Sequence, residues 1–315
     1  MKIVIRALSA LGLMLAAACA GITTTRPLGI TEAGHPIGIE ARQVPLGIAG
    51  ADLAPGVHYA GGLSLHGANL HGLSDLKLDG DQAWTVSDFG TLVRFRIRLD
   101  SNGRLTGAGD ARVRRLVGQD GAVLQPKARA DAEGLALLPG GVAVSFERDH
   151  RIWSYGPRGL DLPMPLRHPD ADFGDNEGME GLSLAPDGNW LVLGESGGAW
   201  RCGSAVCEDL PHAPTDVTDG YRFTAADQDP AGGWFVLQRR YEPPLDMRAR
   251  VRRMSADGRL GPVLIALRAP ASVDNFEGIA VQATATGARL YILSDDNDNP
   301  LEKTLLLAFD IRGAT

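Results

Sequence analysis

The sequence predicts an all-β protein that folds as a single β-propeller. A short pattern recurs along the chain: an acidic residue, glycine, a branched aliphatic residue, a small residue and a second aliphatic residue. It is present at Glu133–Leu137, Glu180–Leu184 and Glu277–Val281, and a variant at His71–Leu76 has histidine in the acidic position. A long internal period of this kind is typical of an array of equivalent structural units.

The spacing of the pattern fits four-stranded propeller blades. Its glycines, Gly72, Gly134, Gly181 and Gly278, are separated by 62, 47 and 97 residues. The last interval is about two periods of ~45–50 residues, the length of a four-stranded blade. We therefore expect a degraded unit inside this interval, with strands at Phe223–Asp227 and Trp234–Leu237.

The number of blades depends on how much chain is available. From Val57 to Ile311 there is room for five or six blades of about 45 residues. The wide first interval favours six blades, with one weak blade at Gly107–Gln125, and five or seven blades are the alternatives. A two-sheet sandwich is the competing fold for an all-β chain with frequent turns.

Local signals support strands and tight turns in each unit. Asp-Gly and Gly-Gly turns between apolar runs, which are strong hairpin signals, are present at Asp79–Asp81, Pro139–Gly141 and Pro186–Gly188. Leu92–Ile97 and Arg151–Tyr155 alternate with period two, as half-buried strands do. The chain has 40 glycines and 19 prolines and no clear helical periodicity after its N-terminus, which fits many turns and few helices.

The N-terminus has the form of a bacterial lipoprotein signal peptide. Residues 1–19 hold a basic start, an apolar stretch at Ala7–Ala18 that is too short to span a membrane, and Cys19, the residue that would be lipidated. Ordinary cleavage after an Ala-x-Ala sequence is the alternative. We expect residues 20–55 to form a tether, with at most an early strand at Ile37–Val44, and residues 56–315 to form the propeller domain. The protein is then exported, and is either periplasmic or anchored to the membrane only through lipidated Cys19.

Net charge and cysteine content limit the choice of partners. The formal net charge is −7, which argues against nucleic acid or anionic lipid as a bulk electrostatic partner. Cys202 and Cys207 lie close together in a chain expected to be exported, so a disulfide is favoured over a metal site. We expect a monomer that binds a small anionic substrate or ligand.

Propeller geometry predicts where the repeated acidic residues meet. The innermost strand of each blade runs along the central channel, so equivalent strands would place four side chains around one rim: His71, Glu133, Glu180 and Glu277. The second strand of each hairpin returns to that rim and would add Asp88, Glu147, Glu195 and Asp295. Such a ring repels itself unless a hard cation neutralises it, basic residues lie between the acids, or some acids stay protonated.

These side chains are candidates for three chemical roles. Oxygen ligands without sulfur favour Ca²⁺ or Mg²⁺, with Ca²⁺ as the possible cofactor, and the candidate ligands are Asp88, Glu133, Glu180, Glu277 and Asp295. A carboxyl group with a raised pKa is a candidate general acid or base, and the candidates for this catalytic role are Glu147, Glu180 and Glu195. The candidates for binding substrate oxygens are His71, Arg148, Arg239 and Arg240. In the alternative interpretation each glutamate pairs with a neighbouring blade and is purely structural.

Several strings, in the same order along the chain, resemble the phytase-like family, also described as "esterase-like activity of phytase", of exported bacterial and plant proteins. They are Asn176–Gly188, Phe146–Arg148, Asn275–Val281 and Leu293–Asn297, and the resemblance extends from about Gly62 to Ile311. The resemblance implies a β-propeller whose acidic residues hydrolyse phosphate or related esters, with these roles at Glu133, Glu147, Glu180, Glu195, Glu277 and Asp295. The chain departs from the pattern at Gln238, where we expect a glutamate before Arg239 and Arg240.

Together these observations predict an exported, metal-assisted hydrolase that acts on an anionic ester, with a phosphoester as the first choice. A non-catalytic envelope protein that binds a ligand or partner at the same rim is the alternative. A lactonase-type propeller is a second enzymatic alternative, because such a site holds a divalent cation among carboxylates and an asparagine. Asn176, Asn275 or Asn297 could supply that asparagine.

Overall fold

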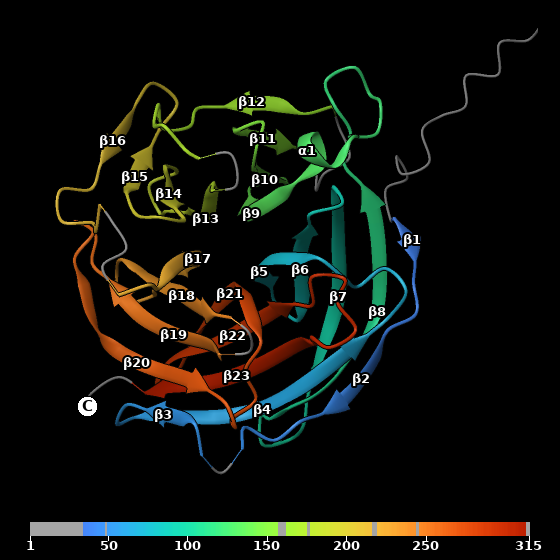
Figure 1. Cartoon of the computed structure of the whole chain (residues 1–315), viewed down its shortest axis with the longest axis vertical. Helices are drawn as coiled ribbons and strands as arrows, with labels where there is room; N and C mark the ends of the chain where they lie inside the picture. The colour runs from blue at the N-terminus through green and yellow to red at the C-terminus, as the bar shows by residue number, and fades with distance from the viewer. Residues whose placement is uncertain are drawn as a thin grey trace, which may run out of the picture.

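The computed structural model describes residues 34–47, 49–156, 162–174, 177–215, 219–243 and 246–312. Within these residues the chain forms five antiparallel sheets arranged radially about a central axis (Figure 1). The innermost strands of the sheets are β5 (Leu73–Asp79), β9 (Ala132–Leu138), β13 (Met179–Leu184), β17 (Arg222–Gln228) and β21 (Asn275–Thr284). Each of them contacts the next, and β21 contacts β5, so the ring is closed. The fold is therefore a single β-propeller, and the predicted sandwich alternative is wrong.

Each blade adds outer strands to one innermost strand. Blade 1 contains β5, β6 (Gln82–Ser87), β7 (Thr91–Leu99), β8 (Leu105–Arg115) and β1 (His35–Pro36). Blade 2 contains β9, β10 (Gly141–Phe146), β11 (Arg151–Tyr155) and β12 (Met164–Leu166). Blade 3 contains β13, β14 (Trp190–Gly194), β15 (Ala199–Cys202) and β16 (Cys207–Asp209).

The last two blades also take strands from the beginning of the chain. Blade 4 contains β17, β18 (Trp234–Glu242), β19 (Asp246–Met254), β20 (Leu260–Arg268) and β3 (Ala51–Leu53). Blade 5 contains β21, β22 (Gly287–Asp295), β23 (Thr304–Arg312), β4 (Val57–His66) and β2 (Glu40–Gln43). Because β4 pairs with β23, the early and late parts of the chain share one sheet and close the ring. Part of the segment expected to be a tether thus forms edge strands, and the range expected to hold an early strand contains β2.

The structure has five blades, so the preferred prediction of six is wrong and the alternative of five is confirmed. No separate blade is present at Gly107–Gln125. Its first part belongs to β8, the long fourth strand of blade 1, and its second part is a loop with one isolated bridge between Val117 and Val123. The wide interval between the first two repeats is filled by the long strands β7 and β8, that loop and the short helix α1 (Lys127–Ala130).

The hydrophobic core lies between neighbouring blades. Trp84 and Val86 of β6, for example, pack in one cluster with Leu135 and Val144 of blade 2. Each fully buried side chain of this size contributes about 1.5–3 kcal/mol relative to an exposed one, so the blade interfaces hold the ring together. No helix among the described residues is long and apolar enough to cross a membrane.

Candidate acidic site at the propeller mouth

A β-bulge in the inner strands sets the position of the candidate side chains. In four blades the pairing register breaks close to the residue that opens the repeated pattern: Glu133, Glu180, Thr224 and Glu277. A bulge places an extra residue opposite one partner and so re-aims its side chain. The bulge therefore turns these side chains toward the rim where the inner strands begin, which we call the mouth.

The glycines that follow Glu133 and Glu277 are required by the close approach of the neighbouring inner strand. A Cβ atom at Gly134 would lie 2.9 Å from the backbone oxygen of Glu180, and one at Gly278 would lie 2.7 Å from the backbone carbon of Asp75. Only a residue without a side chain fits at these points. In these two blades the acidic residue faces the mouth and its glycine meets the next blade, whereas Gly181 lies against Leu193 of its own blade.

The strand register defines two sets of equivalent positions around the mouth. The pairs Leu73↔Ser87, Ala132↔Phe146, Met179↔Gly194, Phe223↔Gln238 and Phe276↔Ser294 are equivalent in the five blades. The next residue on each inner strand gives the first set, which is Ser74, Glu133, Glu180, Thr224 and Glu277. On the second strand of each blade, the residue that follows the paired one gives the other set, which is Asp88, Glu147, Glu195, Arg239 and Asp295. All but Ser74, Thr224 and Arg239 are carboxylates.

In blade 1 this register corrects the sequence alignment. We placed His71 in the acidic position, but the equivalent residue is Ser74, because Leu73 and not Gly72 pairs at the rim. The hydroxyl of Ser74 lies 3.1 Å from Asp88 Oδ1 and 3.3 Å from Glu277 Oε2. His71 packs edge-on against Phe89, 5.1 Å between ring centroids, and does not line the mouth cavity.

In blade 4 the acidic position is taken by a base. The equivalent of the acids is Arg239, and not Gln238, where we expected a glutamate. Arg239 lies 3.8 Å from Glu195 and 3.5 Å from Glu277, and it donates a hydrogen bond to Asn275 Oδ1. Arg240, the next residue along the strand, pairs with Glu242 and does not line the cavity, so of the three predicted arginines Arg148 and Arg239 line the mouth and Arg240 does not.

The mouth is a cavity of about 250 Å³ whose lining is entirely polar or charged. Its lining residues are Asp88, Lys127, Asp131, Glu133, Glu147, Arg148, Glu180, Glu195, Arg239, Glu277, Asp295 and Asn297. Every acidic candidate from the sequence is in this set, together with Arg148 and Arg239. Carboxylates clearly outnumber the basic groups, so the cavity carries excess negative charge when all groups are ionised.

Two lining residues were not predicted, because they lie outside the repeated pattern. Lys127, in α1, places its ammonium 3.3 Å from Asp88 and 3.1 Å from Asp131. Asp131 also accepts a 2.6 Å hydrogen bond from Arg148 Nε. Asp131 lies just before β9, where the other units have no equivalent acid, so only its distance of two residues from Glu133 could have indicated it.

The carboxylates form two groups that could each hold a metal ion. In one group, Asp88, Asp131 and Glu133 offer oxygens that lie within 4.8 Å of one another, and in the other Glu147, Glu180 and Glu195 do so. The first group already contacts Lys127 and Arg148. In the second group the carboxylate of Glu180 has no hydrogen-bond or ion-pair partner within the described part of the chain. The predicted ligand set is thus divided, with Glu133 in one group and Glu180 in the other.

Burial and mutual repulsion raise the pKa of the mouth carboxyl groups. Burial, and next the charge of Asp131, raises the pKa of Glu147 to about 7. Burial raises the pKa of Glu277 to about 7, and burial with the charges of Glu277 and Asp88 raises that of Asp295 to about 9. The pKa values of Glu133 and Glu180 are raised well above the ordinary value by burial first and by neighbouring carboxylates second. The ring therefore needs bound protons or a cation near neutral pH.

Of the remaining predicted residues, only Asn297 lines the mouth cavity among those that the structure describes. Cys202 and Cys207 form a disulfide between β15 and β16. Asn275 uses its amide nitrogen on Glu277, at 2.8 Å, and its oxygen on Arg239, which leaves Asn297 as the asparagine that lines the cavity. Cys19 and Asn176 lie outside the described residues.

Fold and site together define a five-bladed β-propeller with a carboxylate-lined mouth. The chain belongs to the phytase-like family, because the family model described as "Esterase-like activity of phytase" matches residues 68–298. The predicted resemblance to this family is confirmed. No curated protein gave a significant sequence match.

Several solved structures are similar to the chain at low sequence identity. The major Malassezia sympodialis allergen Mala s 1 is 12% identical, with a TM-score of 0.44 over 82% of this chain and 91% of that chain. A chain of the nidogen/laminin complex is 15% identical, with a TM-score of 0.39 over 65% of this chain and 67% of that chain. Since neither TM-score reaches 0.5, the fold assignment depends on the sheet arrangement itself.

Proposed function

We propose that the protein is an exported, metal-assisted hydrolase that cleaves an anionic ester at the propeller mouth, with a phosphoester as the first choice. Membership of the phytase-like family supports a hydrolase-type propeller. The polar cavity supports a small, charged substrate, since it is lined by both carboxylates and bases. The net charge of −7 supports the expectation that nucleic acid is not the partner.

The observation that carries the proposal is the group of Glu147, Glu180 and Glu195, in which Glu180 has no ion-pair partner among the described residues. Three carboxylate oxygens within 4.8 Å of one another match the oxygen-rich ligand set of Ca²⁺ or Mg²⁺. The basic groups lie at 3.4 to 3.8 Å: Arg222 and Arg239 from Glu195, and Arg148 from Glu147. Arg222 is also shared with Glu177, at 2.6 Å. The basic groups of the other cluster lie closer, with Lys127 and Arg148 at 3.1 and 2.6 Å from Asp131, so the charge of Glu147, Glu180 and Glu195 is compensated at longer range.

The other lining residues provide the remaining parts of a hydrolytic site. A bound divalent cation would polarise a phosphoryl oxygen and lower the pKa of an attacking water. Arg239, Arg148 and Lys127 line the same cavity and can bind substrate oxygens. Glu133 has a raised pKa and no ion-pair partner among the described residues, so it can donate a proton to the leaving group. Glu147, Glu180 or Glu195 can accept the proton of the water when it is not occupied as a ligand.

A hydrolysis screen tests the proposal. The purified protein is assayed with p-nitrophenyl phosphate, bis(p-nitrophenyl) phosphate, phytate and simple lactones, with Ca²⁺ or Mg²⁺ and with a chelator. We expect metal-dependent turnover of a phosphoester, and a loss of at least 10²-fold in Glu180→Gln. Glu208→Gln, at an exposed position on β16 of the same blade, is the matched control and should keep full activity.

The pattern of substrates separates the alternatives. Asn297 lines the cavity beside Asp295, and an amide oxygen among carboxylates is the ligand set of the lactonase-type alternative, so turnover of lactones alone would favour that function. Absence of turnover on every substrate, together with an unchanged melting temperature under chelation, would leave the non-catalytic binding protein as the better interpretation.

A further inference from the structure

The charge balance of the mouth cavity limits which esters it admits. Among the described residues, eight carboxylic acids and three bases line it, so its net charge is −5 when every group is ionised. One divalent cation reduces this excess to −3, and protons held by Glu133 and Asp295, whose pKa values are raised by burial, reduce it to −1. Since a negative site repels an anion in proportion to the charge of the anion, the cavity disfavours a doubly charged substrate more than a singly charged one.

Each of the three bases already pairs with a carboxylate of the mouth. Lys127 and Arg148 both contact Asp131, at 3.1 and 2.6 Å. Arg239 lies 3.5 Å from Glu277. A substrate oxygen therefore shares each base with a carboxylate, so the bases offset only part of the charge of a polyanion.

The size of the mouth favours a single phosphate group. Its volume of about 250 Å³ is that of about eight water molecules, at about 30 Å³ each in the liquid. One phosphate group with the first atoms of its substituents fits this space, whereas a molecule with several phosphate groups, such as phytate, does not. The substituents of a bound ester therefore extend outward from the cavity.

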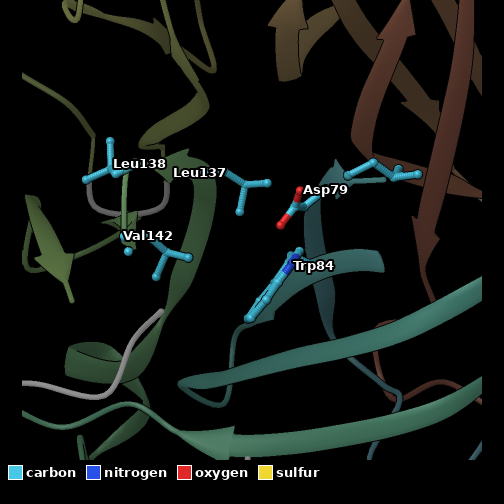
Figure 2. A pocket seen from close by; sticks show the side chains of 8 residues that line it. Asp79, Trp84, Leu137, Leu138 and Val142 are labelled. Atoms are coloured by element: carbon cyan, nitrogen blue, oxygen red, sulfur yellow. The ribbon is translucent and has the colours of Figure 1, made fainter. Parts of the chain in front are cut away.

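The lining of the mouth provides no apolar wall for such a substituent. An apolar cavity of about 230 Å³ at the opposite end of β9 shows the difference, because Trp84, Leu137 and Val142 are among its walls (Figure 2). The mouth lining is entirely polar or charged, so binding there depends on the phosphate group and not on burial of apolar surface. Charge is therefore the property by which the mouth distinguishes between esters.

We infer that the mouth selects phosphodiesters over phosphomonoesters and phytate. The inference rests on the proposed function, because it names the substrate class of the same site. A diester has one negative charge, whereas a monoester approaches two above its second pKa of about 6. In the reaction the oxygen of a water bonds to phosphorus and one P–O ester bond breaks. One proton of the water passes through a mouth carboxylate to the leaving oxygen, and the other stays with the new phosphate group, which releases it to solvent above that pKa.

The monoester product should leave without a second cleavage. At pH 8 it has one more negative charge than the diester, so the mouth repels it more strongly than it repelled the substrate. One diester should therefore yield one alcohol, and the monoester should accumulate.

Two esters with the same leaving group test the selection. Bis(p-nitrophenyl) phosphate and p-nitrophenyl phosphate are compared at pH 8 with Mg²⁺, and phytate is assayed as the polyanion. We expect kcat/KM to be at least about tenfold higher for the diester, with one equivalent of p-nitrophenol released per diester and no phosphate released from phytate. Added NaCl should reduce the difference between the two esters, because salt screens charge.

Glu277→Gln tests whether charge causes the selection. Glu277 lines the mouth but belongs to neither group of possible metal ligands. Removing its charge should lower the ratio of kcat/KM between diester and monoester about threefold to tenfold. Glu208→Gln, at an exposed position on β16 away from the mouth lining, is the matched control and should keep the wild-type ratio.

Binding to the wild type gives a measurement that depends on neither turnover nor the folding of a variant. Protein-observed NMR with Mg²⁺ compares dimethyl phosphate, which has one charge, with methyl phosphate, which has about two at pH 8. We expect dimethyl phosphate to bind at least about threefold more tightly.

The outcomes separate this inference from the hydrolase proposal. A higher kcat/KM for p-nitrophenyl phosphate or phytate than for the diester would overturn the charge selection and leave the hydrolase proposal intact. An unchanged ratio in Glu277→Gln would also overturn it. Turnover of no ester would contradict the hydrolase proposal, and binding would then decide: tighter binding of dimethyl phosphate supports the charge selection, and equal or weaker binding overturns it.

Discussion

At the scale of single residues, the surroundings give chemically identical glutamates different roles. The hydroxyl of Ser196 and the guanidinium of Arg222 lower the pKa of Glu177, which stays ionised. Glu180, three residues later, is buried beside Glu195 and Glu277, and its pKa is raised well above the ordinary value. The first glutamate is a partner for arginine, whereas the surroundings of the second favour its protonated form.

Glu180→Gln should distinguish a mouth that is neutralised by protons from a mouth that binds a divalent cation. Without a divalent cation, the substitution removes a repelling charge, so the melting temperature should stay the same or rise. With Ca²⁺ it removes a ligand, so the increase in melting temperature caused by Ca²⁺ should shrink, since that increase follows the affinity of the folded state. The measurement is the melting temperature of wild type and variant across a Ca²⁺ titration.

Glu208→Gln serves as the control in that titration, because residue 208 is exposed and far from the mouth lining. It should reproduce the wild-type response. If Ca²⁺ raises the melting temperature of Glu180→Gln and of the wild type by the same amount, the proposed metal site at Glu147, Glu180 and Glu195 is contradicted.

At the scale of secondary-structure elements, buried polar groups tie the inner strands of different blades together. Asp75 on β5 accepts a 2.8 Å hydrogen bond from the backbone N–H of Leu135 on β9. Lys77 on β5 lies 2.6 Å from Asp75 and 3.4 Å from the backbone oxygen of Ile279 on β21. The side chains of Asp75 and Lys77 are 0% and 4% exposed, so this pair connects three innermost strands inside the protein.

Lys77→Met should therefore be strongly destabilising. It removes the positive partner while Asp75 stays buried, a change that typically costs about 3–5 kcal/mol. Urea unfolding measures the free energy of unfolding of the variant against the wild type. The double variant Asp75→Asn/Lys77→Met removes both charges and should recover part of the loss. A loss below about 1 kcal/mol in Lys77→Met, the value typical of an exposed pair, would contradict this role.

The elements also show what the sequence can and cannot predict. The full pattern predicts three of the five innermost strands, and its His71 variant indicates a fourth, β5, although in the wrong register. The degraded unit at Phe223–Asp227 is recognisable from its hairpin although Thr224 replaces the glutamate. The position of Ser74 could not be predicted, because His71-Gly72 imitates the pattern and only strand pairing shows the true register.

The blade count and part of the site depend on contacts that lie far apart in the sequence. The lengths of β7 and β8 allow blade 1 to fill an interval that suggested an extra blade. Lys127 and Asp131 come from the connection between blades 1 and 2, whose helix α1 has no counterpart in the described parts of the other connections. Arg240 was predicted with Arg239, but adjacent residues of a strand point to opposite sides, so only one of them could face the mouth.

At the scale of the whole molecule, closure of the ring concentrates negative charge at one end of the axis. Five blades converge there, and their buried carboxyl groups share a cavity of about 250 Å³. Lys127, Arg148 and Arg239 are the basic groups that line this cavity and offset part of the charge. The stability of the entire ring should therefore respond to protons and to cations at the mouth.

In the presence of a chelator, the melting temperature should fall as the pH rises from about 5 to about 8. The pKa values of Glu147 and Glu277 are raised to about 7 and that of Asp295 to about 9, whereas in an unfolded chain carboxyl groups titrate near pH 4. Between these values the folded protein binds more protons than the unfolded chain, so its stability decreases as the pH rises. The stabilisation by these bound protons is fully present below the pKa of the unfolded chain, and it is lost as the pH rises through the pKa of the folded protein.

Two comparisons identify the mouth as the source of this dependence. Asp75, whose burial raises its pKa to about 7, contributes in the same direction, so the double variant Glu147→Gln/Glu277→Gln is needed to isolate the mouth. Between about pH 5 and about pH 8, the melting temperature of this variant should fall less than that of the wild type. Saturating Ca²⁺ should also reduce the decrease, because a cation replaces the protons as the partner of the carboxylates, and the stabilisation by Ca²⁺ should grow with pH. A melting temperature that is independent of pH in the chelator would show that the mouth carboxylates are ionised without cost, and would remove the physical reason for a cation at this site.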